Sequence, residues 1–254
     1  MSKVFKIPPI KLSNNSFIHV IEIEQIDIEF GKFIDDKIRL ITEGNTDTDI
    51  SRIKNRLYNF LRRKKGTTIE MGAVAEFMVH LYMSEMGYKQ EFVFFNLEER
   101  SIKKGFDGYY TLNNEEWILE SKSGLISTKG ISHSAKFSEA YSDIKEKLKD
   151  SDGRNPWRNA YNHACHRPVE SAEDIIKNLK NLADDFDSEL YQNIENLNLL
   201  PAATIFLEGN WSSIDQPLLL SDIKKSITTK RFKGINILCV NIKSLEILED
   251  FLKK

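Results

Sequence analysis

The chain is poor in several features that would place it in a specialised class of protein. Its 254 residues include only two cysteines, Cys165 and Cys239, which give no disulfide framework. No apolar run approaches the ~20 residues that a membrane-spanning helix needs. Residues 1–15 lack the apolar core of a signal peptide. We therefore expect a cytoplasmic protein with no membrane partner.

Two further absences bear on function. The chain has no Gly-x-x-x-x-Gly-Lys-Ser/Thr loop, so nothing in it indicates ATP hydrolysis. Its net charge is −2, which weakens a simple expectation of nucleic-acid binding. The distribution of charge partly restores that expectation, because residues 49–65 and 222–233 are both rich in Lys and Arg. Taken alone, each basic segment is more typical of a solvated helix face.

The most informative stretch runs from Gly105 to Ser123 and is predicted to be a β-hairpin. Asn113 and Asn114 suit a two-residue turn, because Asn tolerates positive φ. Counting back along both strands from that turn sets Asp107 opposite Glu120. Lys122 follows on the same strand face, because side chains alternate along a strand.

This arrangement of charges suggests phosphate chemistry. Two carboxylates facing each other repel unless a cation lies between them, and Mg²⁺ prefers oxygen ligands. A Lys beside the ion can orient or deprotonate a water and offset negative charge. We therefore predict that Asp107 and Glu120 bind Mg²⁺ (Mn²⁺ is an alternative) and that Lys122 positions the water. The plain alternative is a surface hairpin whose Glu and Lys are solvated.

Glu76 supplies an independent signal. Residues 69–86 have helical composition and are apolar nearly all round, which is typical of a buried helix. A buried carboxylate is unfavourable unless it is paired or bound to a metal. We predict that Glu76 is a third acidic group at the site, where it binds a second metal ion or orients a metal-bound water. The alternatives are a buried pair with His80, one helical turn away, and an ordinary solvated position.

Together these residues resemble the PD-(D/E)xK nuclease superfamily. The likeness lies in the Asp107 and Glu120-Ser121-Lys122 motifs with the upstream Glu76, and it covers residues 67–150 best. Phe106-Asp107 stands where the family's first motif has Pro-Asp. The resemblance implies a restriction-endonuclease-like α/β (α+β) core with a mixed sheet flanked by helices, and hydrolysis of DNA.

Within the superfamily, the order of motifs is similar to the nuclease subunit of Hachiman-type antiphage systems (HamA-like). The similarity rests on Gly72-x-x-x-Glu76, on Gly105-Phe106-Asp107 and on the apolar strand ending in Glu120-Ser121-Lys122. It implies a role in antiviral defence and a separate helicase partner. The absence of a motor loop fits dependence on such a partner.

Two regions are expected along the chain. Residues 1–66 are predicted to be a strand-rich region, with strands near 17–24, 26–33 and 38–41, followed by a basic helix over 49–64. Residues 67–254 would form the nuclease-like domain, including an acidic helical insertion at about 151–198. Its further elements are predicted as a strand at 88–97, a helix at 134–150, an irregular segment at 151–168, buried strands at 202–207 and 235–242, and a short closing helix at 244–252.

Contacts with DNA are predicted from basic side chains near these elements. They are Lys136 on the helix after the hairpin, Arg62, Arg63 and Lys64 at the end of the basic helix, and Arg154 and Arg158 in residues 151–168. Three rivals stay open. They are a restriction-type endonuclease with its own sequence specificity, a non-catalytic nucleic-acid-binding subunit, and a structural partner that docks through its acidic helical region.

Overall fold

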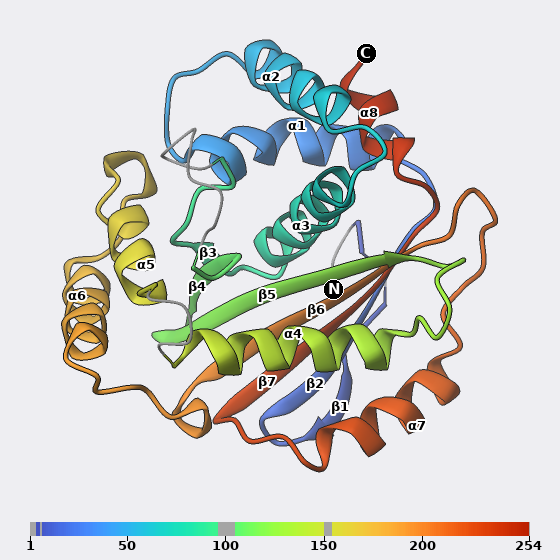
Figure 1. Ribbon diagram of the computed structural model, residues 1–254. Coiled ribbons are helices and arrows are strands. Elements are labelled where there is room, and N and C mark those ends of the chain that lie inside the picture. Colours follow the sequence, from blue (N-terminus) through green and yellow to red (C-terminus); the bar gives the residue numbers. More distant parts are fainter. Residues whose placement is uncertain (1–3, 6, 96–104, 150–153, 254) are drawn as a thin grey trace.

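The protein is an α/β structure built on one mixed seven-stranded sheet (Figure 1). The computed structural model describes residues 4–5, 7–95, 105–149 and 154–253. Along the sheet the strands follow the order β1-β2-β7-β6-β5-β4-β3. The α/β class with a mixed sheet is therefore confirmed.

The four central strands run parallel and the outer ones antiparallel. Strands β2, β7, β6 and β5 pair in parallel, whereas β1 pairs with β2, and β4 with both β5 and β3, in antiparallel fashion. The strands are β1 (Ile10–Ser13), β2 (Ser16–Ile23), β3 (Lys89–Gln90), β4 (Gly108–Leu112), β5 (Glu115–Leu125), β6 (Asn198–Phe206) and β7 (Gly234–Ile242).

Helices cover both faces of the sheet. They are α1 (Ile28–Glu43), α2 (Ile50–Arg63), α3 (Thr68–Glu85), α4 (His133–Lys147), α5 (Pro156–Ala164), α6 (Glu173–Asp187), α7 (Gln216–Ile227) and α8 (Glu246–Leu252). One hydrophobic cluster packs α1, α2, α3 and α8 against one face of the sheet. A second cluster packs α4, α5, α6 and α7 against the other face. Figure 1 shows α3 and α4 on opposite sides of β5. Within the described residues, no helix is long and apolar enough to cross a membrane.

The centre of the sheet is apolar because it is covered twice. Every residue of β6 and β7 is buried. Strands that lie between two helical layers need mostly apolar side chains on both faces, which explains why Leu, Ile, Val and Ala predominate in them. The prediction of buried central strands near 202–207 and 235–242 is confirmed, and so are the predicted helices near 49–64, 134–150 and 244–252.

The first region holds fewer strands than the sequence analysis predicts. Residues 26–33 and 38–41 were predicted to be strands, but Ile28–Glu43 is the helix α1. Its buried Phe30, Ile34, Ile38 and Ile41 recur at helical spacing, and the Asp27 side chain accepts a hydrogen bond from the Phe30 N–H as the N-cap. Strands β1 and β2 join the common sheet, and the boundary at residue 66 stays a prediction.

Three smaller predictions also need correction. The strand predicted over 88–97 is limited to Lys89–Gln90, and residues 96–97 lie outside the described residues. The irregular segment predicted over 151–168 contains α5, which Asn155 caps and Pro156 opens. Helix α7 was not predicted, although Asp215 caps it in the same way.

Candidate active site

The hairpin forms with the register that the sequence predicts. Asn113 and Asn114 have φ values of 50° and 64°, and Leu112 pairs with Glu115. Gly108 pairs with Leu119, so Asp107 stands beside Glu120 at the end of the ladder. The prediction that Asp107 and Glu120 come together across the two strands therefore agrees with this register.

Backbone contacts fix Asp107 at the end of β4. Its N–H donates to the Leu119 carbonyl oxygen (3.1 Å), and its Oδ2 accepts from the Ser121 N–H (2.8 Å). Gly108 follows directly, and a side chain there would meet Leu119 and Tyr110, since an added Cβ would lie 2.9 Å from the Tyr110 ring. The Asp107 carboxylate is thus held against the strand that carries Glu120.

Glu120 is buried and lies on the sheet face covered by α4. Its side chain is 2% exposed. Lys122 donates from Nζ to Glu120 Oε1 (3.3 Å), and Lys147 of α4 donates from Nζ to Oε2 (2.6 Å). Lys122 also forms an ion pair with Asp143 of α4. The site therefore gathers three carboxylates and two ammonium groups from β4, β5 and α4.

Burial dominates the electrostatics of Glu120. Loss of water raises the pKa of its carboxyl to about 8, and the negative charge of Asp107 acts in the same direction. Lys147 and Lys122 act in the opposite direction but do not outweigh these effects. A further positive charge beside Glu120 would favour the ionised carboxylate and lower this pKa.

Lys122 is held in its charged form. Burial acts to lower the pKa of its ammonium group, but Glu120, Asp143 and Asp107 act to raise it and prevail. A protonated Lys122 suits a role in orienting a water or offsetting negative charge. It suits proton abstraction less well, because an ammonium group has no free lone pair.

Glu76 approaches the same region from the other face of the sheet. Its Oε1 lies 3.5 Å from His80 Nε2, and the His80 Nδ1 hydrogen-bonds the Tyr110 hydroxyl. Burial raises the pKa of Tyr110, and the charges of Glu76 and Asp107 raise it further. Glu76 and Asp107 thus both act on Tyr110, and the pair of Glu76 with His80 is the one that the sequence offered as an alternative. Glu76 as a third metal ligand stays a prediction.

The donor set suits a hard cation with two protein ligands. Among the described residues, no group of three or more His, Cys, Asp or Glu side chains is arranged to hold a metal ion. Mg²⁺ is commonly bound through one or two carboxylates while it keeps several waters. Asp107 and Glu120 can supply these two ligands, although burial, rather than the charge of Asp107, is the main cause of the raised pKa of Glu120.

Two residues of the site escaped the sequence analysis. Asp143 and Lys147 stand one helical turn apart on α4, next to the apolar stripe that contains Ile144 and Leu148. Their spacing was visible in the sequence. Their contacts with β5 depend on how α4 crosses the sheet, which the sequence does not reveal.

The predicted DNA-binding residues occupy three separate places. Arg62 and Arg63 are exposed in the last turn of α2, and Lys64 is the C-cap of that helix. Lys136, on α4, pairs with Glu139 (2.8 Å). Arg154 is exposed just before α5.

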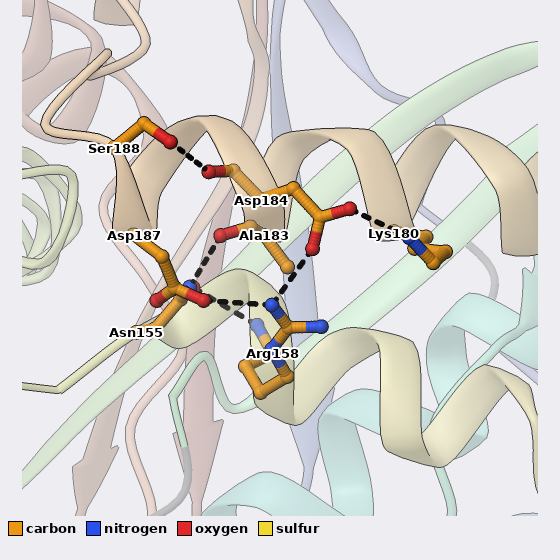
Figure 2. A network of polar contacts seen from close by, with 7 residues as sticks. All are labelled: Asn155, Arg158, Lys180, Ala183, Asp184, Asp187 and Ser188. Atoms are coloured by element: carbon orange, nitrogen blue, oxygen red, sulfur yellow. Dashed lines mark hydrogen bonds and ion pairs between the residues drawn. The ribbon is translucent and has the colours of Figure 1, made fainter.

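Arg158 is already engaged within the protein. Figure 2 shows its guanidinium between Asp184 (2.9 Å) and Asp187 (2.7 Å) of α6. Asn155 joins the same network through Asp187 Oδ1 and the Ala183 carbonyl oxygen. These contacts favour a role in joining α5 to α6 over the predicted contact with DNA.

Comparisons with known proteins assign the chain to no family. No protein-family model matches the chain, and no curated protein matches it. The geometry of the residues therefore carries the functional argument.

Proposed function

We propose that the protein is a metal-dependent nuclease that hydrolyses phosphodiester bonds in DNA. One observation carries the proposal. The hairpin brings Asp107 beside Glu120 at the end of the β4–β5 ladder, with Lys122 Nζ 3.3 Å from Glu120 on the same strand. Two neighbouring carboxylates can hold a metal ion for phosphodiester hydrolysis, and a lysine beside them can offset the charge of the phosphate.

Each residue has a distinct task in this proposal. Asp107 and Glu120 would hold Mg²⁺, which when bound supplies Lewis-acid polarisation of the phosphate and a more acidic water. Lys122, kept protonated by its carboxylate neighbours, positions the water and offsets negative charge on the phosphate. Asp143 holds the Lys122 ammonium group, so that it points along the face shared with Glu120.

The order of elements supports a restriction-endonuclease-like core. Helix α3 precedes the antiparallel hairpin β4–β5, α4 covers the hairpin's catalytic face, and β6 then joins β5 in parallel. This is the sequence of helix, antiparallel strands and covering helix that the resemblance implies. The specific superfamily core remains part of the proposal.

A helicase partner and a role in antiphage defence extend the proposal. They rest on the similarity of the motifs around Glu76, Asp107 and Glu120 to Hachiman-type nuclease subunits. A nuclease without its own motor loop would receive unwound or translocated DNA from a separate protein. Cleavage that increases when the co-encoded helicase is added would support this extension.

One observation favours a second candidate function. Both carboxylate oxygens of Glu120 are held by lysines and the side chain is almost fully buried, so the charges also form a closed network. A non-catalytic nucleic-acid-binding subunit with the same fold would keep such a network for stability. It would bind DNA without cutting it.

The test is Mg²⁺-dependent cleavage of supercoiled and linear plasmid DNA. We expect wild type to cut, and Lys122→Met to lose at least about a hundredfold in rate, because Lys122 acts on the reacting groups. Lys145→Met is the control, since Lys145 is an exposed lysine of the neighbouring helix α4. It should cut at the wild-type rate.

The product pattern separates the remaining rivals. Discrete fragments would indicate a restriction-type endonuclease, whereas a smear would indicate an indiscriminate effector. DNA binding without cleavage by wild type, with and without a helicase partner, would exclude the nuclease and favour the non-catalytic subunit. Circular dichroism of each variant shows that the comparison is made on folded protein.

A further inference from the structure

A different lysine holds each carboxylate oxygen of Glu120. Lys122 Nζ lies 3.3 Å from Oε1, and Lys147 Nζ lies 2.6 Å from Oε2. The Glu120 side chain is buried beneath them. An ion that approaches Glu120 therefore meets an ammonium group that already contacts the carboxylate.

We propose that Lys147 is a built-in counter-cation that holds Glu120 until a divalent ion such as Mg²⁺ displaces it. Lys147 thereby sets the concentration of ion that the site requires. The inference rests on the proposed function, because it takes Asp107 and Glu120 as the ligands of that ion.

The two lysines differ in how firmly they are held. Lys122 is anchored on the central strand β5 and also pairs with Asp143. Lys147 is the last residue of α4, and its side chain is 28% exposed. A flexible four-carbon stem at a helix end can turn its ammonium group into water at little cost. Lys147 is therefore the lysine that an incoming ion displaces from Glu120.

The sign of the effect follows from charge. The Lys147 ammonium group contacts Glu120 Oε2 (2.6 Å), so it repels a divalent ion that approaches this carboxylate. Removal of that charge frees Oε2 and removes the repulsion. Loss of Lys147 should thus tighten ion binding.

The experiment is a titration of the full chain with Mn²⁺, in which electron paramagnetic resonance measures the free ion. A second titration adds Mg²⁺ as a competitor for the same site. We expect Lys147→Met to bind Mn²⁺ at least about tenfold more tightly than wild type. Lys147→Arg keeps the positive charge and should stay close to wild type. Lys145→Met removes the same charge from an exposed position of α4 and should also stay close to wild type.

The outcomes separate the inference from the function on which it rests. Equal Mn²⁺ affinity in wild type, Lys147→Met and Lys145→Met would overturn the inference while leaving the metal site intact. Mn²⁺ binding by Lys147→Met, with none by wild type, would support the inference most strongly. Absence of binding by both wild type and Lys147→Met would overturn the metal site and the inference together. If Lys147→Met does not fold, Lys147→Gln replaces it in the same titration.

Discussion

Glu120 is a carboxylate placed where a carboxylate is unfavourable. It follows the apolar Ile118 and Leu119 on a strand that α4 covers, and Asp107 stands beside it. A buried charge needs partners, and here Lys122 and Lys147 supply them. The structure thus keeps an acid at a position where an apolar residue would pack without this cost, which is common at functional sites.

The raised pKa of Glu120 predicts how stability depends on pH. Because its pKa of about 8 in the folded protein exceeds the ordinary value of 4.5 in the unfolded chain, the folded protein binds the proton more tightly. The resulting stability is fully present below pH 4.5 and is lost as pH rises through 8. Urea unfolding in EDTA should therefore show wild type losing stability relative to Glu120→Gln between these values.

Glu146→Gln is the control for that measurement. Glu146 is exposed on α4, so its substitution should leave the pH profile parallel to that of wild type. Each unit of pKa difference corresponds to about 1.4 kcal/mol, so the Glu120 effect should be well above experimental error. Identical pH profiles for wild type and Glu120→Gln would show that Glu120 is not buried as described.

Asp143 is predicted to act through Lys122. Asp143→Asn removes the carboxylate that pairs with the Lys122 ammonium group, so that group would lose its fixed direction. We expect kcat for DNA cleavage to fall roughly ten- to hundredfold, because small misplacements of a catalytic group are costly. KM for DNA should change little. Steady-state kinetics of Asp143→Asn beside wild type provides the measurement.

Partial rescue distinguishes positioning from a loss of structure. Asp143→Glu keeps the negative charge and should recover part of the rate, whereas a purely structural defect would lower thermal stability in both variants. An Asp143→Asn protein that cuts at the wild-type rate would show that Lys122 does not depend on this contact.

At the scale of elements, local patterns identified the hairpin but not every helix. The Asn113-Asn114 turn and the alternation along β5 fixed both strands and their register before the fold was known. The strands predicted over 26–33 and 38–41 are wrong because the Ile and Phe residues there also fit a strand pattern over short windows. The buried set of α1 shows the helical period only over its full length.

The residues that contact the hairpin from α4 could not be predicted from local sequence patterns. Asp143 and Lys147 lie on a helix whose polar residues look solvated when the sequence is read alone. Their ion pairs with Lys122 and Glu120 span 21 and 27 residues and depend on the crossing of α4 over β5. Contacts of this kind follow from tertiary packing, which neither propensity nor periodicity encodes.

The network between α5 and α6 predicts a mainly structural role for Arg158. Its guanidinium contacts Asp184 and Asp187, and these side chains are partly exposed (Figure 2). Arg158→Ala should lower the free energy of unfolding by about 1 kcal/mol or less, because solvent weakens such pairs. Its affinity for DNA, measured by fluorescence anisotropy, should stay close to that of wild type.

Arg62→Ala/Arg63→Ala is the comparison for Arg158. Both arginines are exposed at the end of α2, where they were predicted to contact phosphates. This pair should weaken DNA binding and reduce its dependence on salt. A large loss of affinity in Arg158→Ala, without loss of stability, would instead restore the prediction that Arg158 contacts DNA.

At the scale of the whole molecule, one sheet brings distant segments to the site. Strand β5 lies between β4 and β6, α3 approaches from one face, and α4 covers the other. Glu76 and Glu120 therefore approach this end of the hairpin from opposite faces, although 43 residues lie between them in the sequence. The sequence predicted these acids as a group, whereas only the fold shows that Asp107 acts on Glu120 and shares Tyr110 as a neighbour with Glu76.

The most direct test of the metal-dependent nuclease is the initial rate of Mg²⁺-dependent DNA cleavage by four proteins. They are wild type, Asp107→Asn, Glu120→Gln and the double variant. If the two carboxylates hold one ion, each single variant should lose at least about a hundredfold, and the double variant should lose little more. A single variant that cuts at the wild-type rate, or losses that multiply in the double variant, would contradict a shared metal site at Asp107 and Glu120.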